Sequence, residues 1–175
     1  MKKLWLVLGI LFLSIVLFGL VGCGGVIPEP PPEIPLELIR EYTGRDYVER
    51  WADGVVSVYD ETSFEGLQGI LDEINTAIDG PVVFFQLSDN TNNAQIKVIF
   101  EELDYGIASS VRIESNDVHE IINVLIRIDP STAECLVYPP ALLVSVGIKS
   151  NQSISQPIKT VLYWLYRLEP GYPLT

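Results

Sequence analysis

The sequence predicts an α+β fold of one domain, a twisted mixed β-sheet packed with about three helices. Three observations predict it. Short β-branched or alternating runs recur between residues 55 and 128. Apolar residues recur at helical spacing in residues 62–78 and again in residues 155–168. Beyond the N-terminal segment, roughly 140 residues remain, which suits one hydrophobic core.

The first strand is expected at residues 55–59, and a helix follows it. Thr62 and Glu65 have the spacing of a capping box, with Thr62 as N-cap and Glu65 at N3. Residues 79–81, Asp-Gly-Pro, stop the helix. Its predicted core face has the helical spacing of Phe64, Leu67, Ile70, Leu71, Ile74, Ala77 and Ile78.

Further strands are expected at residues 82–87, 95–100, about 107–114 and 118–128. The last of these is rich in Ile and Val and ends at Asp-Pro, which favours a buried strand. A short buried helix is then predicted from Pro140 to Ile148, since proline is tolerated in a first helical turn. Ser155 caps a final helix that holds Pro157 in its first turn and ends at residues 170–171.

The N-terminal segment carries Lys2 and Lys3, an apolar run over residues 4–20, and then Leu20-Val21-Gly22-Cys23. This arrangement resembles a bacterial lipoprotein signal peptide and its lipobox. The resemblance implies cleavage before Cys23 and lipidation of the Cys23 sulfur. An uncleaved membrane helix is the alternative, because the run is roughly long enough to span a bilayer. The Gly-Cys ending, the two glycines after it and the proline-rich spacer favour the lipoprotein.

The chain is thus divided into three parts. Residues 1–22 are the signal peptide, residues 23–35 are the lipidated cysteine with a proline-rich tether, and residues 36–175 are the α+β domain. Proline-rich tethers adopt extended, semi-rigid conformations. One acyl chain anchors a protein only marginally, so two or three on Cys23 would be needed for a firm hold. The lipoprotein resemblance places the domain outside the cytoplasm, anchored to the cell membrane, or to the outer membrane where the host has one.

The composition is acidic and limits the partners. The formal charge of −12 becomes −12 − 2 = −14 once Lys2 and Lys3 are removed. Such a domain does not suit nucleic acid, whose phosphates require Lys and Arg. It offers no polybasic attraction to anionic lipid, so acylated Cys23 is the expected contact with the bilayer. Cys135 has no disulfide partner if Cys23 is a thioether, and its apolar neighbours predict a buried, inert thiol.

Four stretches of the domain are similar to one known family. They cover residues 50–59, 96–100, 126–130 and 161–168. Together with the order of the predicted elements, they resemble an exported zinc metallopeptidase of the metzincin, matrixin-like type. In that family a strand and a long helix come first, further strands follow, and then come an active-site helix and a C-terminal helix. The likeness covers about residues 51–174.

The catalytic motif of that family, H-E-x-x-H-x-x-G-x-x-H, is degenerate here. Its best register covers residues 140–150, where Gly147 alone matches. Pro140, Val144 and Ser150 replace the three zinc-binding histidines, and Ala141 replaces the general base. None of these four side chains performs the family's role. The resemblance therefore implies a non-catalytic relative, with no metal and no cofactor.

A second short pattern surrounds the single histidine of the sequence. His119, Glu120 and Asn123 read H-E-x-x-N, one residue short of a zinc motif. Zinc binding at this spacing requires a helix, whereas the Ile- and Val-rich run that continues to Ile128 predicts a strand. We expect an ordinary surface or strand-end histidine at this position.

Three functions remain open from the sequence. The first is a membrane-anchored, non-catalytic peptidase-like domain that binds a peptide or a protein partner of the envelope. The second is a structural envelope lipoprotein with no ligand site. The third is an active hydrolase with an unusual centre at His119 and Glu120. An open, apolar cleft beside residues 140–150 would count against the second.

Overall fold

The computed structural model describes residues 33–132, 134–149 and 154–175, and residues Ile34–Thr175 form one compact unit. Cys23, the signal peptide and most of the tether lie outside the described residues, as does Ser150. The side chain of Cys135 is also not described. In the part of the chain that is described, none of the helices has the length and hydropathy needed to cross a membrane.

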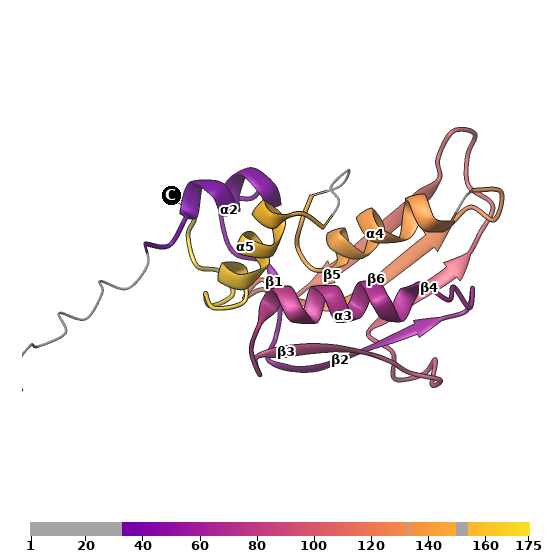
Figure 1. The fold of residues 1–175 in the computed structure, drawn as a ribbon, viewed down its shortest axis with the longest axis horizontal. Helices are drawn as coiled ribbons and strands as arrows, with labels where there is room; N and C mark the ends of the chain where they lie inside the picture. The colour runs from indigo at the N-terminus through magenta and orange to yellow at the C-terminus, as the bar shows by residue number, and fades with distance from the viewer. Residues whose placement is uncertain (1–32, 133, 150–153) are drawn as a thin grey trace, which may run out of the picture. The chain divides into compact units, whose positions relative to one another are not determined.

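The described residues contain four helices and six strands in a mixed α/β arrangement (Figure 1). The helices are α2 (Leu36–Thr43), α3 (Leu67–Ile78), α4 (Glu134–Ser145) and α5 (Gln156–Leu165). The strands are β1 (Arg50–Trp51), β2 (Gly54–Asp60), β3 (Val83–Leu87), β4 (Ile96–Phe100), β5 (Ser109–Ser115) and β6 (Glu120–Ile128).

All six strands form one sheet, which is mostly parallel. Its order is β1-β6-β4-β2-β3, and β5 pairs with β6. The pairing of β5 with β6 is antiparallel, and all the other pairings are parallel. The short β1 pairs with the first two residues of β6. Two of the longer strands, β3 and β5, each pair with a single neighbour and are therefore edge strands.

One face of the sheet is buried and the other is open. Successive side chains of a strand point to opposite faces, so every second residue enters the core. On β2, Val56 and Val58 are buried, whereas Val55, which points to the other face, is 60% exposed. Its neighbour Phe84 on β3 is 49% exposed. The core therefore lies on the face that the helices cover. α3 supplies Leu67, Leu71, Ile74, Ala77 and Ile78, and α5 supplies Ile158, Val161, Leu162 and Leu165.

A buried arginine connects β1 to the C-terminal segment. The Arg50 side chain donates from Nε to the Leu168 carbonyl oxygen at 2.8 Å, and from Nη1 to Asp53 Oδ1 at 2.9 Å. A buried cation is tolerated when its donors are satisfied in this way. Beyond α5, Gly171 and Tyr172 exchange backbone hydrogen bonds with Val48 at 2.8 and 2.9 Å. The end of the chain is thus held beside the residues that lead into β1.

The two edge strands differ in how their outer backbone groups are occupied. On β3, the Asn75 side chain of α3 donates to the Phe85 carbonyl oxygen at 2.9 Å and accepts the Phe85 N–H at 2.8 Å. This amide therefore takes the place that another strand would occupy at the centre of β3. Within the described residues, no side chain bonds to the backbone of β5 in this way. β5 is the more open edge.

The predicted strands are confirmed, with ends that move by one or two residues. Five residues of the predicted helix face are buried in α3, whereas Ile70 is half-buried and Phe64, also half-buried, precedes the helix. The coarse fold class is also confirmed as a mixed sheet with helices, although the described residues form four helices where about three were predicted. The helix α2 was not predicted; it lies in a short segment between Pro35 and the left-handed Gly44. A helix of eight residues is marginal by itself, and α2 is stabilised because one of its sides packs on the core.

The predicted capping box is wrong. α3 begins at Leu67, and its N-cap residue is Gly66 rather than Thr62. The reason is Asp60 at the end of β2, whose carboxylate accepts the Thr62 hydroxyl at 2.5 Å and the Phe64 N–H at 2.9 Å. A carboxylate is a stronger acceptor than a hydroxyl, so it organises this turn before the helix starts.

Both later helices also differ from their predicted bounds. α4 begins at Glu134 rather than Pro140, so Pro139 and Pro140 lie inside it. Burial of Val137 and Tyr138 in the core outweighs the backbone hydrogen bonds that the prolines lack. α5 does have Ser155 as its N-cap residue, although the Ser155 side chain makes no capping bond, and it ends at Leu165 instead of residue 170. The chain turns there, which brings the Leu168 carbonyl to Arg50.

Candidate ligand site at the end of helix α4

The structure places most of the degenerate zinc motif on one helix. Pro140, Ala141 and Val144 belong to α4, and Gly147 follows its last turn, while Ser150 lies outside the described residues. Pro140 and Val144 are four residues apart and share a face of the helix, as two zinc ligands would. Ala141 is buried. Among the described residues, no three His, Cys, Asp or Glu side chains are grouped so that they could hold a metal ion.

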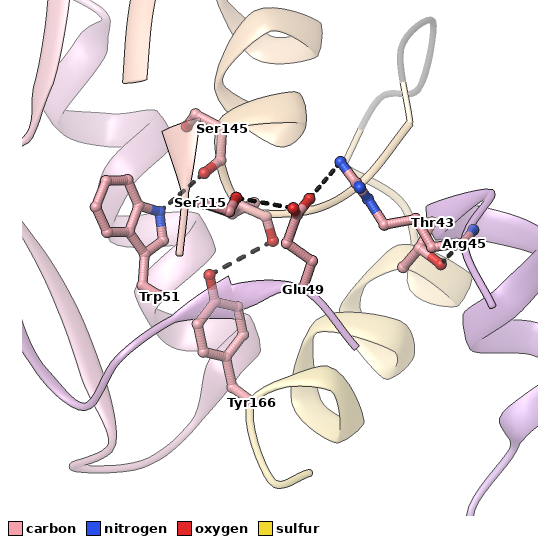
Figure 2. Close-up of polar contacts among 8 residues, drawn as sticks. Thr43, Arg45, Glu49, Trp51, Ser115, Ser145 and Tyr166 are labelled. Carbon is pink, nitrogen blue, oxygen red and sulfur yellow. Dashed lines mark hydrogen bonds and ion pairs between the residues drawn. The ribbon is translucent and has the colours of Figure 1, made fainter. Parts of the chain in front are cut away.

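The last turn of α4 is held by two aromatic side chains, which Figure 2 shows. Trp51 of β1 donates its indole N–H to the Ser145 carbonyl oxygen at 2.8 Å. Tyr166, just after α5, directs its hydroxyl to the Val146 carbonyl oxygen at 3.4 Å. The final carbonyl groups of a helix have no partner within it. Two distant segments therefore satisfy these carbonyls and fix where the helix ends.

Tyr166 is buried, and burial raises the pKa of its phenol well above the ordinary value, while the positive charge of nearby Arg50 lowers it. The Arg50 guanidinium carbon lies 5.8 Å from the centroid of the Tyr166 ring. Because burial is the larger effect, the phenol keeps its proton throughout the physiological pH range. It therefore remains available as the donor to Val146.

Gly147 has a packing reason to be glycine that does not involve a metal. Its φ of +94° is one that other residues rarely adopt. A Cβ atom at this position would lie 2.7 Å from the Glu49 carbonyl oxygen and 3.2 Å from the Leu165 side chain. The chain after α4 thus turns directly against the residue before β1. The single match to the zinc motif is explained by this close approach.

Glu49 also carries a buried carboxylate beside this turn. Its side chain is 8% exposed. The Arg45 guanidinium forms an ion pair with it, and the Ser115 hydroxyl donates to its Oε1 at 2.8 Å (Figure 2). A buried carboxylate needs such partners, because desolvation of an unpaired charge costs several kcal/mol. The hydrogen bond from Ser115 joins the segment before β1 to the end of β5.

A cavity of about 320 Å³ opens at this place. It lies where the turn after α2, strand β5 and the end of α4 meet. The residues around it that matter for its chemistry are Thr43, Arg45, Ile113, Val144, Gly147 and Lys149. Two positions of the degenerate motif, Val144 and Gly147, therefore line a cavity. Its wall combines basic, hydroxyl and apolar groups rather than metal ligands.

Sequence reasoning found only part of this site. It singled out Val144 and Gly147 but missed Thr43, Arg45, Glu49 and Lys149. Arg45 and Glu49 have the spacing of a helical ion pair, yet they lie outside any helix. Gly44 was the local signal in the sequence, since a glycine often marks the turn after a helix, and here it has a positive φ at the end of α2.

The H-E-x-x-N pattern lies elsewhere, at the hairpin between β5 and β6. His119 has a φ of +65° in that turn, and its ring stacks on Tyr47 with the centroids 3.9 Å apart. The Glu120 carboxylate accepts the Asn116 side-chain amide at 2.7 Å. Asn123 lies on β6, as the strand prediction for this run requires. The geometry gives His119 and Glu120 separate neighbours rather than a shared centre.

A second cavity of about 370 Å³ lies beside the loop between β4 and β5. Asp129 lines this cavity and fixes two of its backbone segments, because its Oδ2 accepts the Leu103 N–H at 3.1 Å and its Oδ1 accepts the Ser131 N–H at 2.9 Å. The hydrogen bond from the Ser131 hydroxyl, followed by those from the two backbone N–H groups, lowers the pKa of Asp129. The carboxylate is thus bonded both to the β4–β5 loop, through Leu103, and to the turn after β6, through Ser131.

Replacing Gly147 by alanine should lower the free energy of unfolding by about 1–3 kcal/mol, because the methyl group meets the Glu49 carbonyl in a strained backbone. Gly69→Ala is the matched control. An added Cβ at Gly69 in α3 meets nothing within 4 Å, so the change should be neutral or stabilising by up to about 1 kcal/mol. Urea unfolding followed by tryptophan fluorescence measures both. Equal effects of the two substitutions would contradict the close approach.

Comparison of the chain with models of protein families, with curated proteins and with solved structures finds no match.

Proposed function

We propose that this chain is an extracytoplasmic lipoprotein, held in the membrane by acylated Cys23, whose domain is a non-catalytic relative of metzincin-type peptidases. In this proposal the domain binds an extended segment of a peptide or protein of the envelope. The lipobox-like sequence at residues 20–23 supports the anchor. The order of elements after α2 supports the relationship, since strands β1 and β2, helix α3, further strands, a motif-bearing helix and a C-terminal helix follow one another.

The single observation that carries the binding role is the open edge at β5. An exposed strand edge presents N–H and C=O groups that an extended peptide can pair with. The opposite edge is occupied at its centre by Asn75. β5 also adjoins the cavity at the end of α4, because Ile113 lines that cavity. A peptide paired with β5 would have one side chain within reach of a pocket, which is the usual source of specificity in this mode.

The replaced motif positions support a role without zinc chemistry. Pro140 and Val144 offer no lone pair to a metal, and Ala141 cannot accept a proton. Gly147 is required by packing against Glu49, so its presence does not argue for a catalytic centre. A binding role for the cavity at the end of α4 explains why such a domain would keep its fold after losing its zinc-binding residues.

The peptide-binding role is tested by hydrogen exchange of the purified full-length protein in detergent micelles. The probe is an acetylated and amidated octapeptide of alternating Val and Thr, which favours the extended conformation. At saturating probe, amides within Ser109–Ser115 should become protected, while those within Val83–Leu87 should not change. Protection at β3 alone, or at neither edge, would contradict strand pairing at β5.

Zinc content separates the non-catalytic role from the hydrolase alternative. Elemental analysis of the purified full-length protein should find no stoichiometric zinc, and added zinc should not raise its Tm, because residues 140–147 supply no ligands. Stoichiometric zinc would overturn this assignment. Peptidase activity that disappears in His119→Ala would then favour a centre at His119 and Glu120.

Lipidation is tested at the two cysteines of the chain. In a bacterial host fed an alkyne analogue of palmitate, the protein should be labelled and should sediment with membranes. Cys23→Ser should lose the label and the processing that depends on it. Cys135→Ser is the matched control and should keep both. Label that persists after Cys23→Ser would show that the lipid is attached elsewhere.

A further inference from the structure

We propose that the cavity at the end of α4 binds a carboxylate, and that it thereby selects an acidic side chain or a free C terminus in the segment bound along β5. The part about a bound segment rests on the proposed function. The carboxylate site itself does not, because it follows from Thr43, Arg45 and Lys149 alone.

Thr43 supplies a buried donor at the cavity wall. The residue is 6% exposed and lines the cavity at the last position of α2. Its hydroxyl oxygen accepts the Arg45 N–H at 3.3 Å. Within the described residues, we find no acceptor for the hydroxyl proton. A buried hydroxyl normally donates as well as accepts, so an acceptor atom in the cavity would complete its bonding.

Lys149 supplies a positive charge at the rim. Its backbone N–H donates to the Tyr42 carbonyl oxygen at 2.9 Å, which fixes this residue next to the end of α2. The aliphatic part of its side chain lies over Gly44, with Cδ 4.0 Å from the position that a Cβ of Gly44 would take. Throughout the part of the chain that the structure describes, no carboxylate lies within ion-pair distance of its ammonium group. The charge is available to a ligand.

Arg45 supplies a second cation that is already oriented. Glu49 holds the guanidinium from below, and Ser115 holds Glu49 in turn (Figure 2). A guanidinium carries five N–H donors, so the ion pair leaves several of them for a second acceptor. The side chain of Arg45 is 32% exposed, in contrast to that of Glu49. Its remaining donors are therefore accessible from the cavity.

The balance of charge favours an anion. Arg45 and Lys149 contribute two positive charges, and Glu49 contributes one negative charge, so these groups are net positive in a chain of formal charge −12. Cations near the ends of α2 and α4 also stabilise those helices through their dipoles. That effect accounts for the charges, but it does not account for the buried hydroxyl of Thr43, a residue that lines the same cavity. A planar carboxylate matches the guanidinium, the ammonium and the hydroxyl together.

The position of the cavity connects it to the open edge strand. Ile113 lies in the middle of β5 and lines the cavity. Side chains of a paired peptide alternate between the two faces of the extended sheet. One of them can therefore enter the cavity while the backbone of the peptide pairs with β5. A volume of about 320 Å³ accommodates a short acidic side chain.

The first experiment uses N-acetylglycine as the probe and full-length protein in detergent micelles. Titration followed by NMR should give saturable shifts of the Gly147 and Lys149 amides, whereas neutral N-acetylglycinamide should give none. Lys149→Gln should weaken N-acetylglycine binding by about fivefold or more, as expected for loss of a charged partner. The control Lys159→Gln removes a cation that pairs with Glu73 on another surface, and it should leave binding unchanged. Equal shifts with the acid and the amide would overturn the carboxylate site.

Arg45 needs a conservative change, because its complete removal would leave Glu49 buried without its cation and could unfold the protein. Arg45→Lys keeps the charge but loses the planar set of donors. It should retain the fold, as judged by Tm, and weaken N-acetylglycine binding. Unchanged binding in both Arg45→Lys and Lys149→Gln would overturn the assignment of these residues to the site.

The second experiment separates the carboxylate site from the strand-pairing function. Acetylated, amidated Val-Thr octapeptides with one central Glu or one central Gln are compared with the Gln peptide bearing a free C terminus. Tighter binding of the Glu peptide identifies an acidic side chain as the source, and tighter binding of the free C terminus identifies the chain end. Equal binding of all three would leave strand pairing intact and overturn the selection. N-acetylglycine binding without any peptide binding would retain the carboxylate site and overturn the peptide function.

Discussion

The hydrogen bond from the Trp51 indole to the Ser145 carbonyl is the contact on which the arrangement of the domain depends most. It joins β1, at the start of the sheet, to the last turn of α4. Tyr166 adds a bond to the next carbonyl, and Arg50 lies against the Tyr166 ring while it binds the Leu168 carbonyl. Three segments far apart in the sequence are thereby fixed at one point. The termination of a helix, which is usually a local matter of capping, is here a tertiary interaction.

The candidate site is a direct result of this arrangement. Once α4 ends at Ser145, the chain must turn, and the turn at Gly147 meets the Glu49 carbonyl with no room for a side chain. The Glu49 carboxylate in turn pairs with Arg45 and accepts the Ser115 hydroxyl. The backbone of Glu49 therefore sets the position of the turn after α4, while its side chain sets the position of the basic group at the cavity. A change at either place affects the other.

The secondary structure was largely readable from the sequence, and the reasons are local. β-branched alternation marks β2, β4 and β6, and the apolar stripe of α3 has a clear helical period. The errors occur where distant groups compete with local signals. Asp60 accepts the Thr62 hydroxyl and the Phe64 N–H in the turn before α3, and core burial of Val137 and Tyr138 extends α4 in front of two prolines. No local pattern reveals that Thr43, Arg45 and Lys149 share a cavity, because only the tertiary fold brings them together.

The side chain of Asn75 has a further consequence for how copies of this domain can meet. It occupies the backbone of Phe85 at the middle of β3, so the sheet is extended far more readily at β5 than at its opposite edge. A sheet that is open at both ends can add one copy after another and grow into a fibre. A sheet that is open at one end can pair with a second copy only edge to edge, and the resulting two-fold dimer leaves no strand free for a third. The amide of Asn75 therefore restricts edge-to-edge pairing of the sheet to β5, where such pairing closes after two copies.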